Sequence, residues 1–586
     1  MSSGEKVSAA EALVRQLEDY GVEFIFGTCG HTNIALLDAL GRSPIEFVIA
    51  RHEQAAAHAA DGYARASGRP GVLLTHVGPG MMNAVTGVAT AAMDSVPLVA
   101  IAGDVPSYYH GRHPHQEVNL HADADQAAVF TPFVKRTWRL HRAEDLGRFT
   151  ERAFWTAASG RPGAVLVNVP MDLFSRKVAP CDHPLPAETA VPGLPEATAR
   201  RIAARLTEAE RPLVYLGGGL RGEAGRRAVL SLTEYLDMPM VHSLMAKGAV
   251  PDDHPLLLGM PGFWGMESTN DYTRSADVVL ALATRFAETD ASSWDPRYTW
   301  NLEHEGDLIQ IDIDSAEIGR NFPVAIGAVA DVVLAVEAID KTVREIAPEP
   351  VRRPGVRESI RKERTALFDA SRERGRADDF PLRPERILTD LRETLPADAV
   401  LVTDVGWNKN GVARCYELPA EGRFITPGGA STMGFGPAAA VGVQIARPDR
   451  AVVALVGDGG MSSQLPALPM AVERGLPVVF VVMNNRAHGT IADLQAANFG
   501  ASYGCEFQDP DGEPYSPDFA ALAEACGADG YRIARAGDLV PAIAAALERR
   551  RPAVLDVPMV NEPVPTPGHW NITDIYQGVF PEEEAA

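Results

Sequence analysis

The sequence predicts an α/β protein with three Rossmann-like, doubly wound parallel-sheet domains, and three features lead to this prediction. The apolar runs AVVALV (451–456) and VVFVVM (478–483) flank a helix-like segment, as expected for parallel strands joined by a crossover helix. Segments 161–172 (RPGAVLVNVPMD) and 551–560 (RPAVLDVPMV) nearly repeat one another, which suggests that each closes one of two related domains. A third domain is predicted from apolar runs at 211–220, 278–286 and 308–314.

Two linkers set the expected domain boundaries. Residues 181–198 are rich in proline, and 346–380 carry many Arg and Glu residues, as a solvated connector helix does. The predicted domains are 1–180, 192–345 and 381–559, followed by a C-terminal segment, 560–586. In that segment three prolines precede an aromatic cluster (Trp570, Tyr576 and Phe580), which predicts burial, either as a lid over an active site or as a dimer-packing arm.

Composition and charge restrict the class of protein. The chain has 586 residues, 46% of them hydrophobic, and a formal net charge of −23, which argues against nucleic acid and anionic membranes as main partners. The N-terminus has no apolar signal core, and no apolar run reaches the length of a membrane span. The five cysteines are scattered without CxxC spacing, as expected for reduced thiols. We therefore expect a cytoplasmic enzyme.

Polar residues close the two strands of the 451–483 unit. Gly457-Asp458-Gly459 ends the first apolar run, and Asn485 follows Asp458 by 27 positions at the end of the second. Carboxyl ends of parallel strands open on one edge of a sheet, so the Asp carboxylate and the Asn amide oxygen are expected to meet there. Such hard oxygen ligands suit Mg²⁺, and Gly459 and Gly460 let phosphates approach a helix N-terminus. A turn glycine and a polar strand end in an ordinary Rossmann-like domain are the alternative.

With these motifs the chain resembles the thiamine diphosphate (ThDP) enzymes of the acetolactate synthase superfamily over nearly its whole length. The resemblance implies that Asp458, Asn485 and the backbone carbonyl of Ala487 hold Mg²⁺. It also implies that Glu53, in the segment RHEQ, is the catalytic glutamate that contacts the pyrimidine ring of ThDP. The three domains would be pyrimidine-binding, central and diphosphate-binding, with active sites between the subunits of a homodimer or homotetramer.

Further cofactor contacts follow from the same resemblance. Gly406, Trp407 and Asn408, after the apolar run AVLVTDV, lie where the family binds the diphosphate, together with Gly457. Met433, in GGASTMGFG, matches the methionine that bends the cofactor. A methionine beside glycines that only fills space is the alternative.

Substrate specificity is predicted from departures from the family pattern. The RFDDR-like segment, whose last arginine contacts a 2-keto acid, reads RFAET and ends in Thr289, while Leu494 replaces a tryptophan. Two glycine-rich turns of the first domain carry His31 and His76, each of which is either catalytic or structural. Gln116, in HPHQEVN, matches a family glutamine near the reactive carbon of the cofactor.

An acid also lies in the loop after the metal-binding asparagine. The segment TIAD, which ends at Asp493, resembles the TIE segment of pyruvate decarboxylases, displaced by one residue. In an apolar pocket with a raised pKa, this carboxyl group would transfer a proton to or from the substrate. A solvated helix aspartate is the alternative.

These features resemble most the 2-hydroxyacyl-CoA lyases of the actinobacterial branch. The resemblance implies cleavage of a substrate such as 2-hydroxyisobutyryl-CoA to a ketone or aldehyde plus formyl-CoA, with the C-terminal segment closing over the acyl-CoA. Two alternatives stay open: an acetolactate synthase-like carboligase or decarboxylase acting on 2-keto acids, and a non-catalytic protein with the ThDP fold. The intact Glu53, Asp458 and Asn485 argue against the last.

The central domain has features of a nucleotide site. Gly217-Gly218-Gly219, Arg285 and the segment 312–314 (DID) resemble the FAD site of acetolactate synthases, which related lyases use for ADP or for the ADP part of CoA. Three glycines after a strand are a weak signal. We predict ADP or CoA rather than FAD, because the other acetolactate synthase specificity residues are absent.

Overall fold

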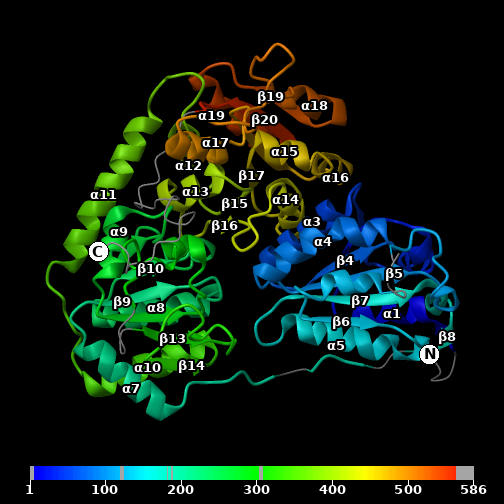
Figure 1. The fold of residues 1–586 in the computed structure, drawn as a ribbon, viewed down its shortest axis with the longest axis horizontal. Coiled ribbons are helices and arrows are strands. Elements are labelled where there is room, and N and C mark those ends of the chain that lie inside the picture. The colour runs from blue at the N-terminus through cyan, green and yellow to red at the C-terminus, as the bar shows by residue number, and fades with distance from the viewer. Residues whose placement is uncertain (1–5, 119–124, 181–182, 187–188, 303–307, 562–586) are drawn as a thin grey trace, which may run out of the picture.

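A computed structural model describes residues 6–118, 125–180, 183–186, 189–302 and 308–561 of the chain. It contains three six-stranded sheets, each wholly parallel and each in its own α/β domain, which confirms the predicted fold class. Figure 1 shows the first domain in blue and cyan, the central domain in green and the third in yellow to red, one at each corner of a triangle. The predicted lid or arm lies, from residue 562 onward, outside the described residues.

The first domain is a parallel sheet covered by helices on both faces. Its strands, in spatial order, are β3 (Glu46–Ile49), β2 (Phe24–Gly27), β4 (Gly71–Thr75), β5 (Leu98–Asp104), β7 (Ala164–Pro170) and β6 (Arg136–Arg139). One face carries α3 (Glu53–Ser67) and α4 (Pro79–Met93). The other face carries α1 (Ala9–Asp19), α2 (Ile34–Leu40), α5 (Leu146–Ala158) and α6 (Met171–Phe174). A short antiparallel pair joins β1 (Val7–Ser8) to β8 (Lys177–Val178).

The central domain repeats this plan. Its strands, in spatial order, are β11 (Leu257–Gly259), β10 (Met240–His242), β9 (Pro212–Leu216), β12 (Val278–Leu282), β13 (Leu308–Asp312) and β14 (Ile326–Val329). Its helices are α7 (Glu196–Glu208), α8 (Gly222–Leu236), α9 (Glu267–Arg274) and α10 (Val332–Ile346). The connector to the third domain is α11 (Val356–Gly375), within the segment predicted as a solvated helix and seen along the left edge of Figure 1.

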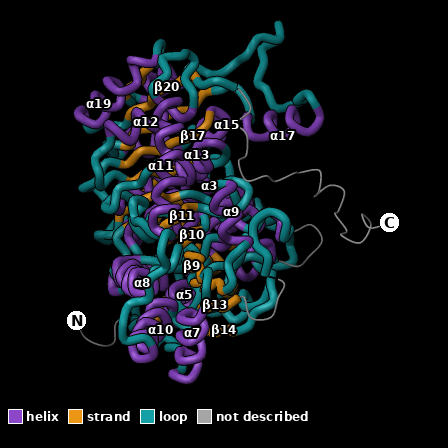
Figure 2. The backbone as a smooth tube through the Cα atoms, turned by 90° about the vertical axis from the view of Figure 1, so that its left-hand side faces the viewer, coloured by secondary structure: helices purple, strands orange, loops and turns teal. Residues whose placement is uncertain are grey.

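The third domain contains the predicted strand–helix–strand unit. Its strands, in spatial order, are β16 (Arg423–Ile425), β15 (Val400–Thr403), β17 (Val452–Gly457), β18 (Val478–Asn484), β20 (Ala553–Pro558) and β19 (Asp529–Arg532). One face carries α14 (Phe435–Ala446), α15 (Asp458–Ser463), α16 (Ala467–Glu473) and α18 (Phe519–Cys526). The other carries α12 (Pro384–Thr394), α13 (Trp407–Cys415) and α19 (Leu539–Arg549). Helix α17 (Gly489–Phe499) projects from the margin of the domain (Figure 2).

The crossover between β17 and β18 differs from the sequence prediction in one respect. We expected one helix within roughly 463–475, whereas α15 and α16 are two short helices with a break at 464–466. Pro466 explains the break, because proline disfavours helical geometry in the residue before it and donates no backbone hydrogen bond.

One hydrophobic core is shared by the first and third domains, because α3 packs directly on α14. The helices approach closely: a Cβ atom on Gly62 would lie 2.2 Å from the carbonyl oxygen of Ala439, and one on Gly442 would lie 1.8 Å from that of Ala59. Since residues 59 and 62 meet residues 442 and 439, the two helices run antiparallel. Arg65, near the end of α3, accordingly lies over the ring of Phe435, at the start of α14.

The structure also shows the state of the cysteines and the character of the helices. The four cysteines in the described part of the chain are all free. No helix in the described ranges combines the length and the apolar composition that a membrane crossing requires.

Candidate active site

The carboxyl ends of three adjacent parallel strands bring the predicted cofactor residues of the third domain together. Asp458 and Asn485 directly follow β17 and β18, and Gly406 lies three residues after β15. Gly406 caps α13 with φ 95° and ψ −150°, a conformation that essentially only glycine adopts. A Cβ atom there would lie 3.2 Å from the hydroxyl oxygen of Thr490, so the start of α17 also reaches this edge.

Asp458 is a buried carboxylate at this edge, with 2% of its surface exposed. Its Oδ1 atom accepts a hydrogen bond of 2.7 Å from the backbone N–H of Gly459, whereas Oδ2 is buried and has no hydrogen-bond partner. Burial raises the pKa of Asp458 to about 6, against the opposing effect of nearby backbone N–H groups. A buried carboxylate oxygen without a partner is costly unless a cation binds it, so this atom fits a metal ligand.

The two asparagines after β18 have different environments. Asn484 is buried and donates through Nδ2 to Ser516 at 2.9 Å and to Asp556 at 2.8 Å, so it anchors the strand end. Asn485 donates through Nδ2 to Asn561 at 3.0 Å, which leaves its Oδ1 atom as a possible metal ligand. In the described ranges no group of three or more His, Cys, Asp or Glu residues gathers as a metal site. The predicted Mg²⁺ site has one carboxylate, one side-chain amide and the carbonyl of Ala487 as ligands. It contains only one acidic side chain and so would not form such a group, yet its three oxygen ligands suit Mg²⁺.

The predicted diphosphate and thiamine contacts lie around the same edge. Gly457 ends β17, and Gly459 and Gly460 lie in the first turn of α15. The Sδ atom of Met433 lies 3.5 Å from the position of a Cβ atom on Gly459, so these two predicted residues are neighbours. Trp407 begins α13, and Asn408 donates through Nδ2 to the carbonyl of Val405 at 2.8 Å.

Two residues that sequence reasoning missed help to build this edge. The carboxylate of Asp404, buried after β15, accepts hydrogen bonds of 3.0 Å from the N–H groups of Gly434 and Gly436, and burial raises its pKa to about 6. It therefore fixes the turn that carries Met433. The ring of His488 lies 2.9 Å from the position of a Cβ atom on Gly459. The sequence contains a signal for each residue. Asp404 is a polar residue at the end of the run AVLVTD, and His488 lies three positions after Asn485.

The predicted catalytic residues of the first domain form a second cluster. Glu53 is the first residue of α3, and its carboxylate accepts hydrogen bonds from Thr28 Oγ1 at 2.6 Å and from Asn83 Nδ2 at 3.0 Å. Gly80 leaves the carboxylate accessible, because a Cβ atom at that position would lie 3.2 Å from Glu53 Oε1. Two donors thus orient a half-buried carboxylate at a helix N-terminus.

His76 lies close to Glu53, because a Cβ atom on Gly80 would contact both side chains, and His31 and Gln116 in turn contact His76. His76 contacts Thr32 Oγ1 through Nδ1 at 3.0 Å and Gln116 Oε1 through Nε2 at 2.8 Å. The ring centroids of His31 and His76 are 4.8 Å apart, and His115 stacks on the other side of His31 at 6.1 Å. Burial and the two neighbouring histidines lower the pKa of His31, so its ring is neutral near pH 7.

Hydrogen bonds on both sides hold the ring of His76. Thr32 gives its hydroxyl proton to the carbonyl of Gly103 at 3.0 Å, so its hydroxyl oxygen accepts from His76 Nδ1. The Nε2 atom faces the side-chain amide of Gln116 at 2.8 Å. Thr32 and Gln116 therefore orient the ring.

The two clusters are not joined within one chain. Glu53 begins α3, whereas Arg65, twelve residues further on, lies over Phe435 at the start of α14, next to Met433. At 1.5 Å per residue, Glu53 lies about 18 Å along the helix axis from that end of α14. Each chain therefore carries two half-sites at opposite ends of one helix pair.

Curated relatives of similar length cover nearly the whole chain. A probable acetolactate synthase large subunit from Methanocaldococcus jannaschii is 33% identical, over 98% of this chain and 96% of its own length. The acetolactate synthase isozyme 3 large subunit of Escherichia coli K12 is 33% identical, over 93% of both chains. An acetolactate synthase from Mycobacterium bovis is 34% identical, over 95% of this chain and 88% of its own length.

The three domains also match the three parts of one family. Residues 7–128 match the N-terminal thiamine pyrophosphate (TPP) binding domain of the thiamine pyrophosphate enzymes, 199–339 match their central domain and 404–557 match their C-terminal TPP binding domain. The chain belongs to the thiamine pyrophosphate enzyme family. Thiamine pyrophosphate is ThDP, so the two half-sites lie on the two ThDP-binding domains of a ThDP-dependent enzyme.

Two predicted substrate-side features of this family member have less defined surroundings. Asp493 is half-buried in α17, one turn after Thr490, which itself reaches the third-domain edge. Thr289 stands at the position of the family arginine. Its carbonyl oxygen packs against Gly262, because a Cβ atom on Gly262 would lie 2.0 Å from that oxygen. This backbone contact lies within the central domain.

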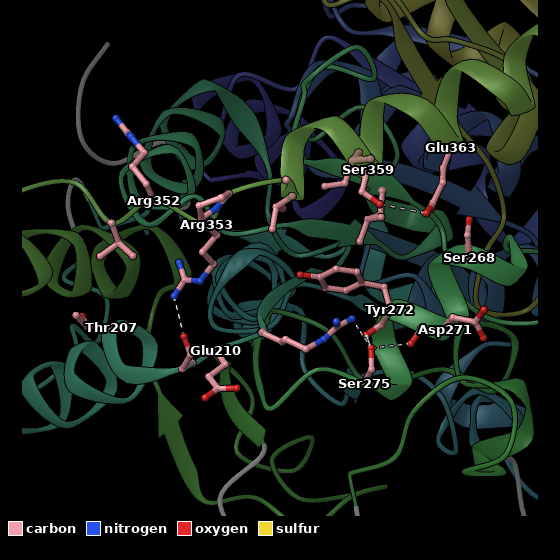
Figure 3. A pocket seen from close by; sticks show the side chains of 18 residues that line it. Thr207, Glu210, Ser268, Asp271, Tyr272, Ser275, Arg352, Arg353, Ser359 and Glu363 are labelled. Atoms are coloured by element: carbon pink, nitrogen blue, oxygen red, sulfur yellow. Dashed lines mark hydrogen bonds between the residues drawn. The ribbon is translucent and has the colours of Figure 1, made fainter.

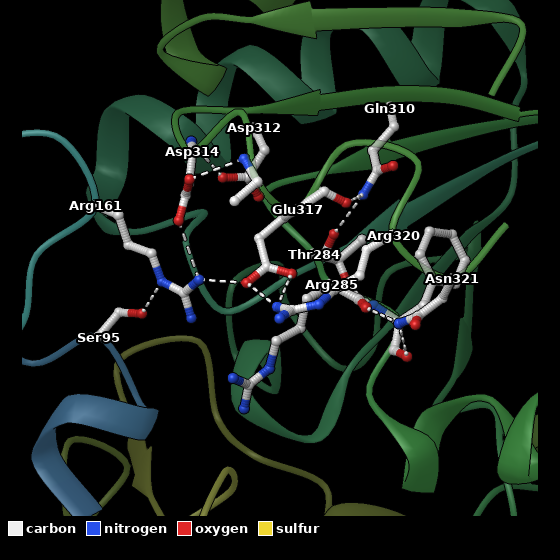
Figure 4. A network of polar contacts seen from close by, with 12 residues as sticks. Ser95, Arg161, Thr284, Arg285, Gln310, Asp312, Asp314, Glu317, Arg320 and Asn321 are labelled. Atoms are coloured by element: carbon white, nitrogen blue, oxygen red, sulfur yellow. Dashed lines mark hydrogen bonds and ion pairs between the residues drawn. The ribbon is translucent and has the colours of Figure 1, made fainter. Parts of the chain in front are cut away.

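The predicted nucleotide region of the central domain forms a polar network with the first domain (Figure 4). Arg161 of the first domain bonds to Ser95 at 2.9 Å, to Asp314 at 3.3 Å and to the buried Glu317. The glycines after β9 are explained by packing, because a Cβ atom on Gly217 would lie 1.9 Å from the carbonyl oxygen of Ala283. These contacts place the acidic loop after β13 at a domain junction and do not identify a nucleotide.

Proposed function

We propose that this enzyme uses ThDP to decarboxylate a 2-keto acid and join the product to a second carbonyl compound, as an acetolactate synthase-type carboligase. The observation that carries the proposal is similarity to several proteins named acetolactate synthase over more than nine-tenths of the chain. This extent includes both half-sites, so the reaction class is inferred from the whole architecture and not from a single motif.

The third-domain half-site would hold the diphosphate and its metal. Asp458 Oδ2, Asn485 Oδ1 and the carbonyl of Ala487 are proposed to bind Mg²⁺, because the orphaned carboxylate oxygen already fits a cation. The diphosphate would lie against the backbone at the starts of two helices, contributed by Gly406, Trp407, Asn408, Gly457, Gly459 and Gly460. Met433, fixed by the Asp404 turn, is proposed to support the thiamine rings.

The first-domain half-site would control protons. ThDP, when bound, supplies a carbon nucleophile that stabilises negative charge during carbon–carbon bond cleavage and formation. Glu53, oriented by Thr28 and Asn83, is proposed to exchange a proton with the cofactor ring, which is why a carboxyl group at this place is needed. His76, in its hydrogen bond with Gln116, is proposed to donate a proton to the substrate oxygen.

The separation of the half-sites leads to a proposal about assembly. Since Glu53 and Asp458 lie at opposite ends of the α3–α14 pair, a complete site needs the first domain of one chain and the third domain of another. We propose a homodimer with two such sites, or a homotetramer built from two dimers, because twofold assembly completes both sites at once.

A second candidate function is the 2-hydroxyacyl-CoA lyase, and one observation favours it. The cluster of His31, His76 and Gln116 provides groups that could take the proton of a substrate hydroxyl, while Thr289 stands where the arginine for a keto-acid carboxylate is expected. In this reaction a histidine would act as general base, with Asp493 as the alternative acid-base group. The products would be a ketone or aldehyde and formyl-CoA.

We also propose a nucleotide in the central domain. Arg285 extends toward the third domain, where a Cβ atom on Gly429 would lie 2.7 Å from its guanidinium (Figure 4). Asp312 ends β13, and Asp314 follows it in the next loop. Acidic side chains after a strand suit ribose hydroxyls. ADP or CoA remains the preferred ligand, and a yellow protein with bound FAD would instead favour the acetolactate synthase type.

A substrate panel tests the two candidates against one another. The protein would be incubated with ThDP, Mg²⁺ and either 2-keto acids, such as pyruvate and 2-ketobutyrate, or 2-hydroxyacyl-CoAs, such as 2-hydroxyisobutyryl-CoA. Release of CO₂ with formation of acetohydroxy acids would support the carboligase. Formyl-CoA with a ketone, and no turnover of keto acids, would replace it by the lyase.

A further inference from the structure

A cavity of about 780 Å³ lies in the central domain, away from both half-sites (Figure 3). Its walls are residues 207–211 before β9, helix α9, and the connector from Val351 to the first turns of α11. Since β9 leads from this cavity to Gly217, the cavity and the predicted nucleotide region lie at opposite ends of the strand. The volume is in the range of small-molecule sites, which is about 300–1,000 Å³.

The cavity carries positive charge that the protein itself does not neutralise. Within the described chain, neither Arg211 nor Arg352 forms an ion pair, although both line the cavity. Of the lining carboxylates, Asp271 is paired with Arg274, so Glu210 and Glu363 oppose the three lining arginines, Arg211, Arg352 and Arg353, and one positive charge remains in excess. The start of the 20-residue helix α11, capped by Gly355, adds backbone N–H groups and the positive end of the helix dipole.

An aromatic ring forms one wall of the cavity. Tyr272 is half-buried, and the guanidinium of Arg211 lies over its ring at 4.9 Å from the centroid. In the described part of the chain the Tyr272 hydroxyl donates no hydrogen bond, and Figure 3 shows it pointing across the cavity toward the side where Arg353 lies. Apolar lining residues, namely Leu258, Val356 and Ile360, surround the ring. A flat or apolar body therefore fits beside Tyr272.

The wall formed by the connector is held in place by Arg353. Its guanidinium donates to the carbonyl of Ala209 at 3.0 Å and to that of Leu236, which are at the C-terminal ends of α7 and α8. Its backbone N–H donates to Asp237 at 3.0 Å, and Arg357 donates to the same carboxylate at 2.5 Å. These bonds tie the start of α11 to the body of the domain, so the cavity is preformed.

We propose that this cavity is a binding site for a small organic anion that carries a phosphate or carboxylate group on an aromatic body. Arg211 and the start of α11 would bind the anionic group, and Tyr272 would stack on the ring. The site stands apart from the proposed reaction, because no residue of the cavity belongs to either half-site. Its connection to α11 places such a ligand on the link between the central and third domains.

Calorimetric titration of the full chain, with ThDP and Mg²⁺ present to fill the diphosphate site, tests this proposal. The probe is 1-naphthyl phosphate, and we expect saturable binding of one molecule per chain. Inorganic phosphate and 1-naphthol, which each lack one half of the probe, should bind at least about tenfold more weakly. Titration with 1-naphthoate distinguishes a site that requires phosphate from one that accepts a carboxylate.

Variants assign the binding to this cavity. Arg211→Gln should weaken binding at least about tenfold, and Tyr272→Leu should do the same for the naphthyl probe. The matched control is Arg361→Gln, on α11 but outside the cavity lining, which should bind as the wild type does. Circular dichroism would verify that each variant is folded. Absence of saturable binding to the wild type, or equal affinity in Arg211→Gln and the wild type, would overturn the proposal.

Discussion

Glu53 and Asp458 belong to opposite ends of the same antiparallel helix pair, although both are expected to act on one cofactor. Glu53 begins α3, and Asp458 follows β17 at the edge where α14 starts. The contact of Arg65 with Phe435 fixes the direction of the pair. Helix geometry puts about 18 Å along the axis between them, so we propose that the two residues of one chain belong to two different sites.

The carboxyl group of Glu53 should be needed for turnover but not for cofactor binding. Glu53→Gln keeps the shape of the side chain and its contacts with Thr28 and Asn83, yet removes the exchangeable carboxyl proton. We expect the turnover number to fall at least about 10²-fold, the scale of a positioned acid–base group. Steady-state kinetics and calorimetry with ThDP measure the two effects. Glu23→Gln, at an exposed site, is the control, and near-normal turnover in Glu53→Gln would remove Glu53 from the reaction.

Asp458→Ala should lose the cofactor, because the change removes the only carboxylate proposed to bind the metal. We expect the affinity for ThDP in the presence of Mg²⁺ to fall at least about 100-fold, beyond what loss of a supporting residue causes. Titration calorimetry measures this, with Asp449→Asn, an exposed aspartate on another loop, as the control. Unchanged affinity would mean that the oxygen ligands at the end of β17 have been misidentified.

The contact of Gly442 with Ala59 should tolerate no side chain. Gly442→Ala places a Cβ atom 1.8 Å from a backbone oxygen, so α3 and α14 must separate, at a cost of about 1–3 kcal/mol in the free energy of unfolding. Thermal and denaturant unfolding measure this loss. Gly41→Ala is the matched control, since a Cβ atom there has its nearest neighbour at 3.5 Å and the backbone is helical. Equal stability of both variants would show that the helix contact is looser than described.

Asp404 should contribute to the pH dependence of stability. Burial raises its pKa in the folded state from 3.8 to about 6, so the folded protein holds this proton more tightly than the unfolded chain. The stabilisation is therefore fully present below pH 4 and is lost as pH rises to about 6. In Asp404→Asn the decline of the melting temperature over this window should be smaller than in the wild type. Asp38→Asn, at an exposed site, should leave the decline unchanged; an equal decline in Asp404→Asn would contradict the assignment.

The sequence predicted the structure best where a regular apolar run is followed by a polar residue at the end of a strand. The apolar runs before Asp458 and Asn485 predicted one edge of a parallel sheet, because period and spacing determine such an edge locally. The strands β10, β11 and β14 were missed, since three or four residues carry no recognisable period. Asp404 was missed because its role depends on a turn 30 residues further along the chain.

The relation between the two half-sites was also beyond local sequence reasoning. Alanine- and glycine-rich helices such as α3 and α14 favour close packing, but the direction of the pair depends on contacts between residues 370 or more positions apart, such as Arg65 and Phe435. The resemblance implied sites between subunits. The structure adds an observation that supports this proposal, namely that the α3–α14 pair separates the two residues within one chain.

Mixing two inactive variants tests this central claim most directly. Glu53→Gln and Asp458→Ala each inactivate both sites of their own homodimer, but a mixed dimer has one site with both changes and one site with neither. Random co-assembly in co-expressed protein should restore about one quarter of wild-type activity, because half of the dimers are mixed and each has one intact site of two. Purification through two different affinity tags would isolate the mixed dimers, with about half of wild-type activity expected. Mixed dimers that remain as inactive as either parent would contradict an active site shared between two chains.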